Sequence, residues 1–140
     1  MVRITNHDLI KLLREDARRS YTELAGVFGV SEAAVRKRIR KLEEEGVIKK
    51  YTVVVDLRKL GYNVHVLIGI DASPEKFLYI VDELKKIEEV INLYTSTGDH
   101  MMLAECWFKD SQELSEFVKK INKLDGVTRV CPAIILEKIK

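Results

Sequence analysis

Two short helical patterns joined by a glycine turn occupy residues 20–51 and constrain the fold of this chain more than any other segment. Ser20 and Glu23 stand three residues apart, the spacing of a reciprocal capping box at a helix start. Gly29 can end this first helix in the left-handed conformation, and Ser31 is a good N-cap for a second helix. A turn of about three residues therefore joins the two helices, as in a helix-turn-helix.

The second helix carries an apolar stripe and a cationic face. Its apolar residues recur at the spacing of one buried stripe: Val35, Ile39 and Leu42. At about 100° per residue, the positions farthest from this stripe are small at the start of the helix and basic in its body. A small residue lets the backbone approach base edges, and cations meet phosphates or guanine. We predict that DNA is contacted by Ser31, Glu32, Ala33, Arg36, Lys37, Arg38, Arg40 and Lys41.

A basic run can also be only a solvated helix face, and three glutamates follow this one at residues 43–45. Two neighbouring segments favour DNA binding over that alternative. An amphipathic segment at residues 9–13 can cover the helix pair. Val47–Val55 is a β-rich run with Lys49 and Lys50 near its start, which predicts the wing of a winged helix.

The distribution of charge along the chain supports a DNA-binding first half. Residues 1–60 contain 14 Lys and Arg against 9 Asp and Glu, a net charge of +5. Residues 61–140 contain 10 against 13, a net charge of −3, so the overall +2 hides a basic and an acidic half. Such asymmetry is expected of a DNA-binding head with a separate partner domain.

The chain of 140 residues is predicted to form two small domains. Residues 1–50 are the helix-turn-helix domain, residues 51–61 the wing and hinge, and residues 62–140 the second domain. Each domain is marginal in size, so self-association is expected. No apolar run approaches the roughly 18 residues of a membrane span, and the polar start has no signal-peptide core. We expect a cytoplasmic chain without a membrane partner.

The second half alternates between strand and helix periodicity. Strand patterns cover residues 64–72, 90–97, 101–108 and 127–139, and helix patterns cover residues 74–87 and 111–124, the latter capped by Ser111. The order βαββαβ predicts a ferredoxin-like unit, in which two helices pack on one face of a four-stranded antiparallel sheet. The fold class is therefore α+β.

The other face of this sheet predicts self-association. In the strand at residues 101–108, Leu103 and Trp107 alternate with a second apolar set, so both faces are rich in apolar groups. Two helices cover only one face, and the other would expose a large apolar patch in a monomer. We predict a homodimer with its sheets packed face to face, an arrangement that suits paired DNA half-sites.

Residues that suggest other chemistry do not assemble into motifs. Cys106 and Cys131 lack a metal-ligand spacing and are interpreted as small apolar residues, with a disulfide as the alternative. The histidines are not placed to form a metal site, so no metal is predicted. No phosphate loop or nucleophile motif is present, so we predict a protein that is not an enzyme and needs no cofactor. A small-molecule sensor that acts without DNA is the remaining alternative.

The motifs together resemble the Lrp/AsnC, or feast/famine, family of transcription regulators, and are most similar to its archaeal members. The resemblance is carried by DARRSYTELAGVFGVSEAAVRKRIRKLEEEGVIKKYTVVVD in the first half and by STGDHMMLAECW and GVTRV in the second. It implies that the second domain is a RAM/ACT-like effector-sensing domain. It also implies a dimer, often assembled into tetramers or octamers, that binds double-stranded promoter DNA. Family members often bind their own promoter, which implies autoregulation.

The resemblance also implies an amino-acid effector near a Gly-Asp-x-Asp loop between the second and third strands of the sensing domain. Here Gly98 and Asp99 match this pattern, but Met101 stands at the second acidic position. Asp99 can accept an ammonium group, backbone amides near Gly98 can donate to a carboxylate, and neighbouring polar groups can tune selectivity. The predicted effector residues are Thr95, Thr97, Gly98, Asp99 and His100. A plain strand-connecting turn is the alternative interpretation of the loop.

Overall fold

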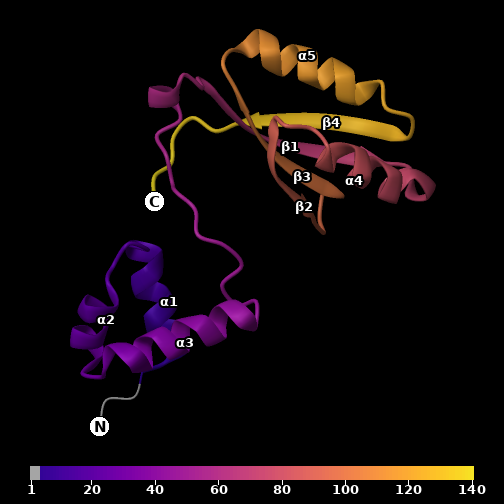
Figure 1. Ribbon diagram of the computed structural model, residues 1–140. Coiled ribbons are helices and arrows are strands. Elements are labelled where there is room, and N and C mark those ends of the chain that lie inside the picture. The colour runs from indigo at the N-terminus through magenta and orange to yellow at the C-terminus, as the bar shows by residue number, and fades with distance from the viewer. Residues whose placement is uncertain (1–3) are drawn as a thin grey trace. The chain divides into compact units, whose positions relative to one another are not determined.

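The computed structural model describes residues 4–140, which form two compact units that divide between Val54 and Val55 (Figure 1). The N-terminal unit contains three helices, α1 (Asn6–Glu15), α2 (Tyr21–Phe28) and α3 (Glu32–Glu44). The C-terminal unit contains, in chain order, η1 (Arg58–Leu60), β1 (Val64–Ala72), η2 (Pro74–Lys76), α4 (Phe77–Lys85), β2 (Val90–Thr95), β3 (Met102–Phe108), α5 (Ser111–Asn122) and β4 (Val127–Ile134).

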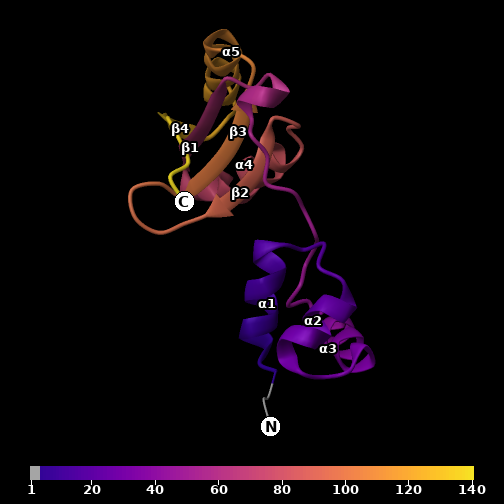
Figure 2. The ribbon, with the colours of Figure 1, turned by 90° about the vertical axis from the view of Figure 1, so that its left-hand side faces the viewer.

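The three N-terminal helices pack around one apolar core (Figures 1 and 2). Each helix contributes its predicted apolar stripe: Leu9 and Leu13 from α1, Leu24 and Phe28 from α2, and Val35, Ile39 and Leu42 from α3. Burial of these stripes fixes how each helix is rotated about its own axis. The helix-turn-helix predicted from the sequence is confirmed.

Local hydrogen bonds set the ends of α2 and α3. The Glu23 amide donates to Ser20 Oγ over 3.1 Å, and the Ser20 amide donates to Glu23 Oε2 over 3.3 Å, which confirms the capping box. Gly29 ends α2 with φ +64°, a conformation that a Cβ atom disfavours. Ser31 Oγ accepts from the Ala34 amide over 3.1 Å and caps α3. The ends of the two helices, and so the turn between them, are therefore set by the residues from which the turn was predicted.

The predicted strand at Val47–Val55 is wrong for the single chain. The amides of Val47 and Ile48 donate to the Leu42 carbonyl over 2.9 and 3.1 Å, so the start of this segment closes the end of α3. Residues 49–56 are irregular, and Val53 and Val54 are 76% and 80% exposed. The β-branched residues favour extended backbone, but a strand forms only where a second strand pairs with it.

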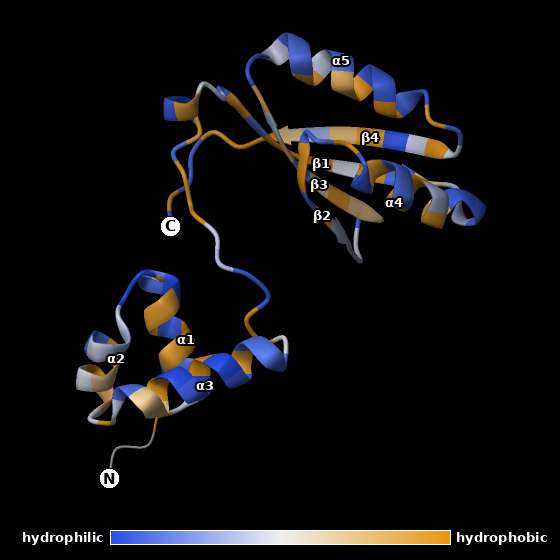
Figure 3. Ribbon diagram, viewed as in Figure 1, coloured by the Kyte–Doolittle hydropathy of each residue, from blue (hydrophilic) through white to orange (hydrophobic). Residues whose placement is uncertain are grey.

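The C-terminal unit is the predicted βαββαβ fold. Its antiparallel sheet has the strand order β2-β3-β1-β4. One face packs against α4 and α5 through a core that includes Ile68, Ile80, Met102, Phe117 and Ile121. Figure 3 shows apolar and polar residues interspersed along both helices and along β4.

Several boundaries differ from the sequence prediction: among others, α4 ends at Lys85, β3 begins at Met102 and α5 ends at Asn122. Helix α5 is capped by Asp110, whose Oδ1 accepts from the Glu113 amide over 2.9 Å, and Ser111 is its first residue. Strand β4 ends at Ile134 because the backbone beyond it has only one further bond to β1, from the Ile135 amide to the His65 carbonyl. Strand β2 ends at Thr95, two residues before the predicted end.

The sheet face opposite the helices, here called the open face, mixes apolar and polar groups. Cross-strand pairing places Leu67, Leu103 and Trp107 on it, and all three are half-buried. A polar ladder crosses the same face, in which Glu105 lies 2.7 Å from His65 Nε2 and accepts from Asn92 Nδ2 over 2.6 Å. Burial raises the pKa of Glu105, but the hydrogen bonds with Asn92 and His65 lower it by a larger amount. The pKa therefore lies below its ordinary value.

Candidate functional site

The exposed face of α3 is the strongest candidate for a nucleic-acid interface. Because Val35, Ile39 and Leu42 are buried, the helix turns its opposite side outward. Ala33, Lys37, Arg40 and Lys41 are exposed there, and Figure 3 shows hydrophilic residues along most of α3. Lys41 Nζ lies 3.8 Å from Glu45 in a weak pair that leaves the lysine side chain 68% exposed. The outward strip is therefore small at its start and cationic along its length.

Two of the predicted contacts lie on the flank of α3 that faces α2. Thr22 Oγ1 donates to Glu32 Oε1 over 2.6 Å, which fastens the start of α3 to the start of α2. The Arg36 guanidinium lies 5.1 Å from the centre of the Tyr21 ring, within range of a cation–π contact. The sequence analysis did not single out Tyr21 and Thr22, although their positions directly after the capping box place both at the start of α2.

The opposite flank of α3 faces α1 and holds Arg38. This side chain is half-buried, and its Nη1 donates to Asn6 Oδ1 over 3.1 Å. Asn6 is the first residue of α1, so the bond joins two helices within the unit. Arg38 thus differs from the other cations of α3, whose side chains are exposed. The hydroxyl oxygen of Ser31 accepts the hydrogen bond that caps α3.

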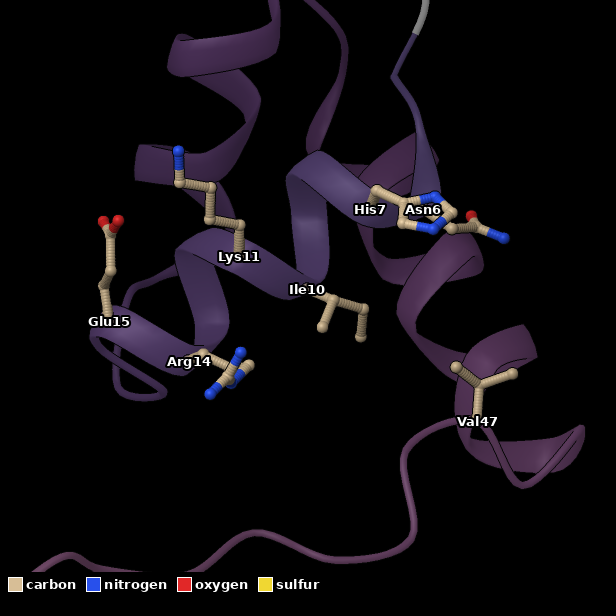
Figure 4. Close-up of a pocket in the computed structure, with 7 residues that line it drawn as sticks. All are labelled: Asn6, His7, Ile10, Lys11, Arg14, Glu15 and Val47. Atoms are coloured by element: carbon tan, nitrogen blue, oxygen red, sulfur yellow. The ribbon is translucent and has the colours of Figure 1, made fainter.

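A shallow hollow of about 610 Å³ lies beside α1. Figure 4 shows His7, Ile10, Lys11 and Arg14 on α1, with Val47 on the segment that follows α3. Ile10 and Val47 give it an apolar part, and its charged lining contains the basic Lys11 and Arg14 together with the acidic Glu15. The sequence analysis treated this stretch of α1 only as a cover for the helix pair and missed the hollow.

The loop between β2 and β3 is held by Asp71 of β1. Asp71 Oδ1 accepts from the Met101 amide over 2.9 Å, and its Oδ2 accepts from Arg129 Nε over 2.8 Å. His100 Nδ1 lies 3.0 Å from the same Oδ2. Burial raises the pKa of Asp71, but hydrogen bonds from Arg129, Met101 and His100 outweigh it and lower the pKa to about 2.

Asp99 belongs to the same cluster. Arg129 Nη2 donates to the Asp99 carbonyl over 2.6 Å and to Asp99 Oδ1 over 3.1 Å. His100 Nε2 lies 3.4 Å from Asp99 Oδ2. The His100 ring lies against the backbone of Gly69, where a Cβ atom would overlap it. The Asp99 carboxylate thus has Arg129 as a cationic partner within the chain, although the side chain remains 79% exposed.

The five predicted effector residues do not converge on one hollow. Thr95 and Thr97 line a hollow of about 370 Å³ with Phe77, Ser96 and Met101. Asp99 and His100 instead join the cluster centred on Asp71. The sequence analysis missed Asp71 and Arg129 because both lie outside the loop, on strands that only the sheet brings beside it.

Comparisons with known proteins identify both units. Residues 3–49 match the family model for a winged helix-turn-helix DNA-binding domain, and residues 64–140 match that for the Lrp/AsnC ligand binding domain. The HTH-type transcriptional regulator LrpA of Pyrococcus abyssi is 47% identical over 133 residues, which cover 94% of each chain. The chain belongs to the Lrp/AsnC family of transcription regulators.

Solved structures of other proteins share the fold of this Lrp/AsnC regulator. The AsnC protein of E. coli is 27% identical with a TM-score of 0.84, and the match covers 99% of this chain and 95% of that one. A transcriptional regulator of Neisseria meningitidis, solved in complex with L-Met, has a TM-score of 0.87 at 20% identity, with 99% and 93% covered. The order of the domains predicted from the sequence matches the order of the two family models.

Both cysteines of the Lrp/AsnC chain are free thiols in the structure. Cys106 pairs with Val66 on the helix-covered face, whereas Cys131 pairs with Gly69 on the open face, so the sheet separates them. Burial raises the pKa of Cys106 to about 12, with Glu89 and Glu105 adding to the shift. Cys106 and Cys131 therefore form no disulfide with each other in the structure.

The described part of the chain contains neither a metal-binding cluster nor a helix that could span a membrane. Among residues 4–140, no group of three or more His, Cys, Asp or Glu side chains is arranged to hold a metal ion. Within the same residues, every helix is too short or too polar to cross a membrane.

Proposed function

We propose that this Lrp/AsnC regulator binds double-stranded promoter DNA with α3 as the recognition helix. The observation that supports this proposal most strongly is the exposed cationic strip of α3, which lies opposite the buried stripe of the same helix. In a helix-turn-helix the second helix lies in the major groove, where its first residues contact base edges. Ser31, Glu32 and Ala33 lie at that end, while Arg36, Lys37, Arg40 and Lys41 supply cations for guanine or phosphate. Arg38 acts within the protein, through Asn6.

Arg40→Ala tests this assignment. The substitution removes an exposed cation from the middle of the strip, so affinity should fall by roughly five- to a hundredfold on a duplex selected from a random pool. Lys119→Ala removes one positive charge from an exposed position on α5 and is the matched control. Affinity measured by fluorescence anisotropy at several salt concentrations checks the result. Equal affinity of both variants and the unmodified chain would place the recognition face elsewhere.

The C-terminal unit is proposed to bind an amino acid at the β2–β3 loop through Thr95, Thr97, Gly98, Asp99 and His100. The match of residues 64–140 to the ligand-binding family model supports this proposal, as does the hollow between Thr95, Thr97 and Phe77. Linkage requires that an effector that changes DNA affinity is itself bound more or less tightly when DNA is present. The absence of a thermal shift with all twenty amino acids, with and without DNA, would count against the proposal.

The protein is further proposed to act in the cytoplasm as a homodimer that assembles into tetramers or octamers, and to control its own promoter. The half-buried leucines and Trp107 of the open face support self-association. Selection of genomic fragments bound by the protein, with and without amino acids, tests autoregulation. Recovery of fragments that never include its own promoter would contradict it.

A further inference from the structure

The four cations at positions 36–40 of α3 fall into three sets once their neighbours are known. Lys37 and Arg40 lie on the outward strip and are exposed. Arg38 lies on the flank beside α1, where it is half-buried and bonded to Asn6. Arg36 is exposed but lies on the flank beside α2, over the Tyr21 ring at 5.1 Å. The structure therefore separates residues that share one sequence pattern.

We propose that Tyr21 is a positioning residue that holds the Arg36 guanidinium for a phosphate of the DNA backbone, while Arg38 only ties α3 to α1. The inference rests on the proposed function, because it assumes that α3 enters the major groove. It adds Tyr21, a residue outside α3, to the DNA-binding surface. It also assigns Arg36 to the backbone and leaves base reading to the outward strip.

The position of Tyr21 indicates the backbone as the target of Arg36. In a helix-turn-helix the first helix crosses the DNA backbone while the second lies in the groove. Tyr21 is the first residue of α2, directly after the Ser20–Glu23 capping box. An arginine that stacks on this ring is turned from the outward strip toward the helix that meets the phosphates.

The contact with the Tyr21 ring orders the Arg36 side chain, which is otherwise exposed. Long cationic side chains lose rotamer freedom when they bind, and a planar guanidinium held on an aromatic face loses less at that moment. Tyr21 itself is 37% exposed, so its ring is available to the guanidinium without a change in the core. The nearby Glu32 carboxylate accepts a hydrogen bond from Thr22 Oγ1 over 2.6 Å.

Arg38 is better placed to join α3 to α1 than to contact DNA. At about 100° per residue, Arg36 and Arg38 lie roughly 200° apart around α3, so they cannot meet the same phosphate. Asn6 Oδ1 accepts the Arg38 Nη1 bond across 32 residues of sequence. Loss of this bond should loosen the packing of α1 on α3 and change the stability of the unit rather than its charge-dependent affinity for DNA.

The test uses the full chain, two duplexes and a double-mutant cycle. One duplex is selected from a random pool for high affinity, and the other has a scrambled sequence of the same composition. Tyr21→Leu should weaken binding to both duplexes by roughly two- to fivefold, the size of a cation–π contact at an exposed site. Tyr21→Phe keeps the ring and should restore binding, whereas Arg36→Ala should lower the slope of log affinity against log salt by about one.

The coupling between the two residues is the decisive readout. In the Arg36→Ala background, Tyr21→Leu should have no further effect on affinity. A merely structural role of Tyr21 would lower the melting temperature and weaken both backgrounds equally, and that outcome overturns the proposal. Arg38→Ala should lower the melting temperature and leave the salt slope unchanged, so a lower slope would overturn its assignment.

Two further outcomes separate this inference from the proposed function. If Arg40→Ala weakens DNA binding but the Tyr21 and Arg36 variants bind like the unmodified chain, only the inference fails. If Arg40→Ala has no effect while Lys119→Ala also has none, the recognition helix itself is misassigned. If Arg36→Ala changes base preference at an unchanged salt slope, Arg36 reads a base and the phosphate assignment is wrong.

Discussion

At the scale of single residues, Asp71 organises the β2–β3 loop although the loop does not contain it. It accepts from the Met101 amide and from Arg129, and His100 lies beside it. An acid at Asp71 lies near the position where the family pattern has its second acid and this chain has Met101. We interpret Asp71 as the group that orders this loop.

Asp71→Asn should destabilise the C-terminal unit by about 1–3 kcal/mol near neutral pH, because it weakens bonds to charged partners in a half-buried place. The folded pKa of Asp71 is lowered from 3.8 to about 2, so its carboxylate stabilises the fold above about pH 4. This contribution is lost as the pH falls from about 4 to about 2. Urea unfolding followed by Trp107 fluorescence should show the difference between the two proteins closing over that range.

Asp125→Asn is the control for the loss of one carboxylate. Asp125 pairs with Lys76 over 3.0 Å but is 80% exposed, so its substitution should change the free energy of unfolding by less than about 0.5 kcal/mol. A pH-independent difference between Asp71→Asn and the unmodified chain would contradict the lowered pKa of Asp71.

At the scale of elements, the start of α5 shows which of two adjacent residues caps the helix. The sequence offers both Asp110 and Ser111 as helix-starting residues, and either type is a good N-cap. The structure uses Asp110, which accepts from the Glu113 amide, while the Glu113 side chain accepts from the Lys109 amide over 2.8 Å. Ser111 is therefore the first residue of the helix and not its cap.

Asp110→Ala should therefore lower the free energy of unfolding by about 1 kcal/mol, because it removes the cap of α5. Ser111→Ala is the matched variant, one residue along, and should be close to neutral since its side chain makes no cap in the structure. Urea unfolding of both variants measures the difference. The reverse order of the two effects would show that Ser111 is the working cap.

At the scale of the whole molecule, we expect the open face of the sheet to be the surface through which the chain self-associates. Leu67 and Leu103 lie on it between polar groups, and Tyr94 is 54% exposed beside them. Face-to-face packing of two such sheets would bury these side chains and remove an apolar patch from water. Association of this kind would also fix the spacing of two recognition helices on DNA.

Leu103→Lys should convert the dimer into a monomer at micromolar concentration, because it places a charge in the middle of the open face. Leu78→Lys is the control, since Leu78 is 74% exposed on α4 and lies on the other side of the sheet. Light scattering of the unmodified chain and both variants gives the masses. A monomeric mass for the unmodified chain would contradict the proposed homodimer.

Local patterns were sufficient to predict most elements of this chain. The Ser20–Glu23 box, the left-handed Gly29 and the Ser31 cap act over three or four residues, so a sequence shows them directly. The alternation of Val66, Ile68 and Ile70 likewise predicts the buried face of β1. The segment after α3 was misread because its β-branched residues express a preference for extended backbone and cannot show whether a partner strand exists.

The sequence by itself determined the two domains, their order and the cationic face of α3, because helix caps, periodicity and charge are properties of neighbouring residues. Only the tertiary structure decided which cations remain available and what holds the β2–β3 loop. Arg38 meets Asn6 across 32 residues, Arg36 meets Tyr21, and Asp71 meets Arg129 across 58 residues. Such contacts depend on how helices pack and in which register strands pair, and no local pattern records either one.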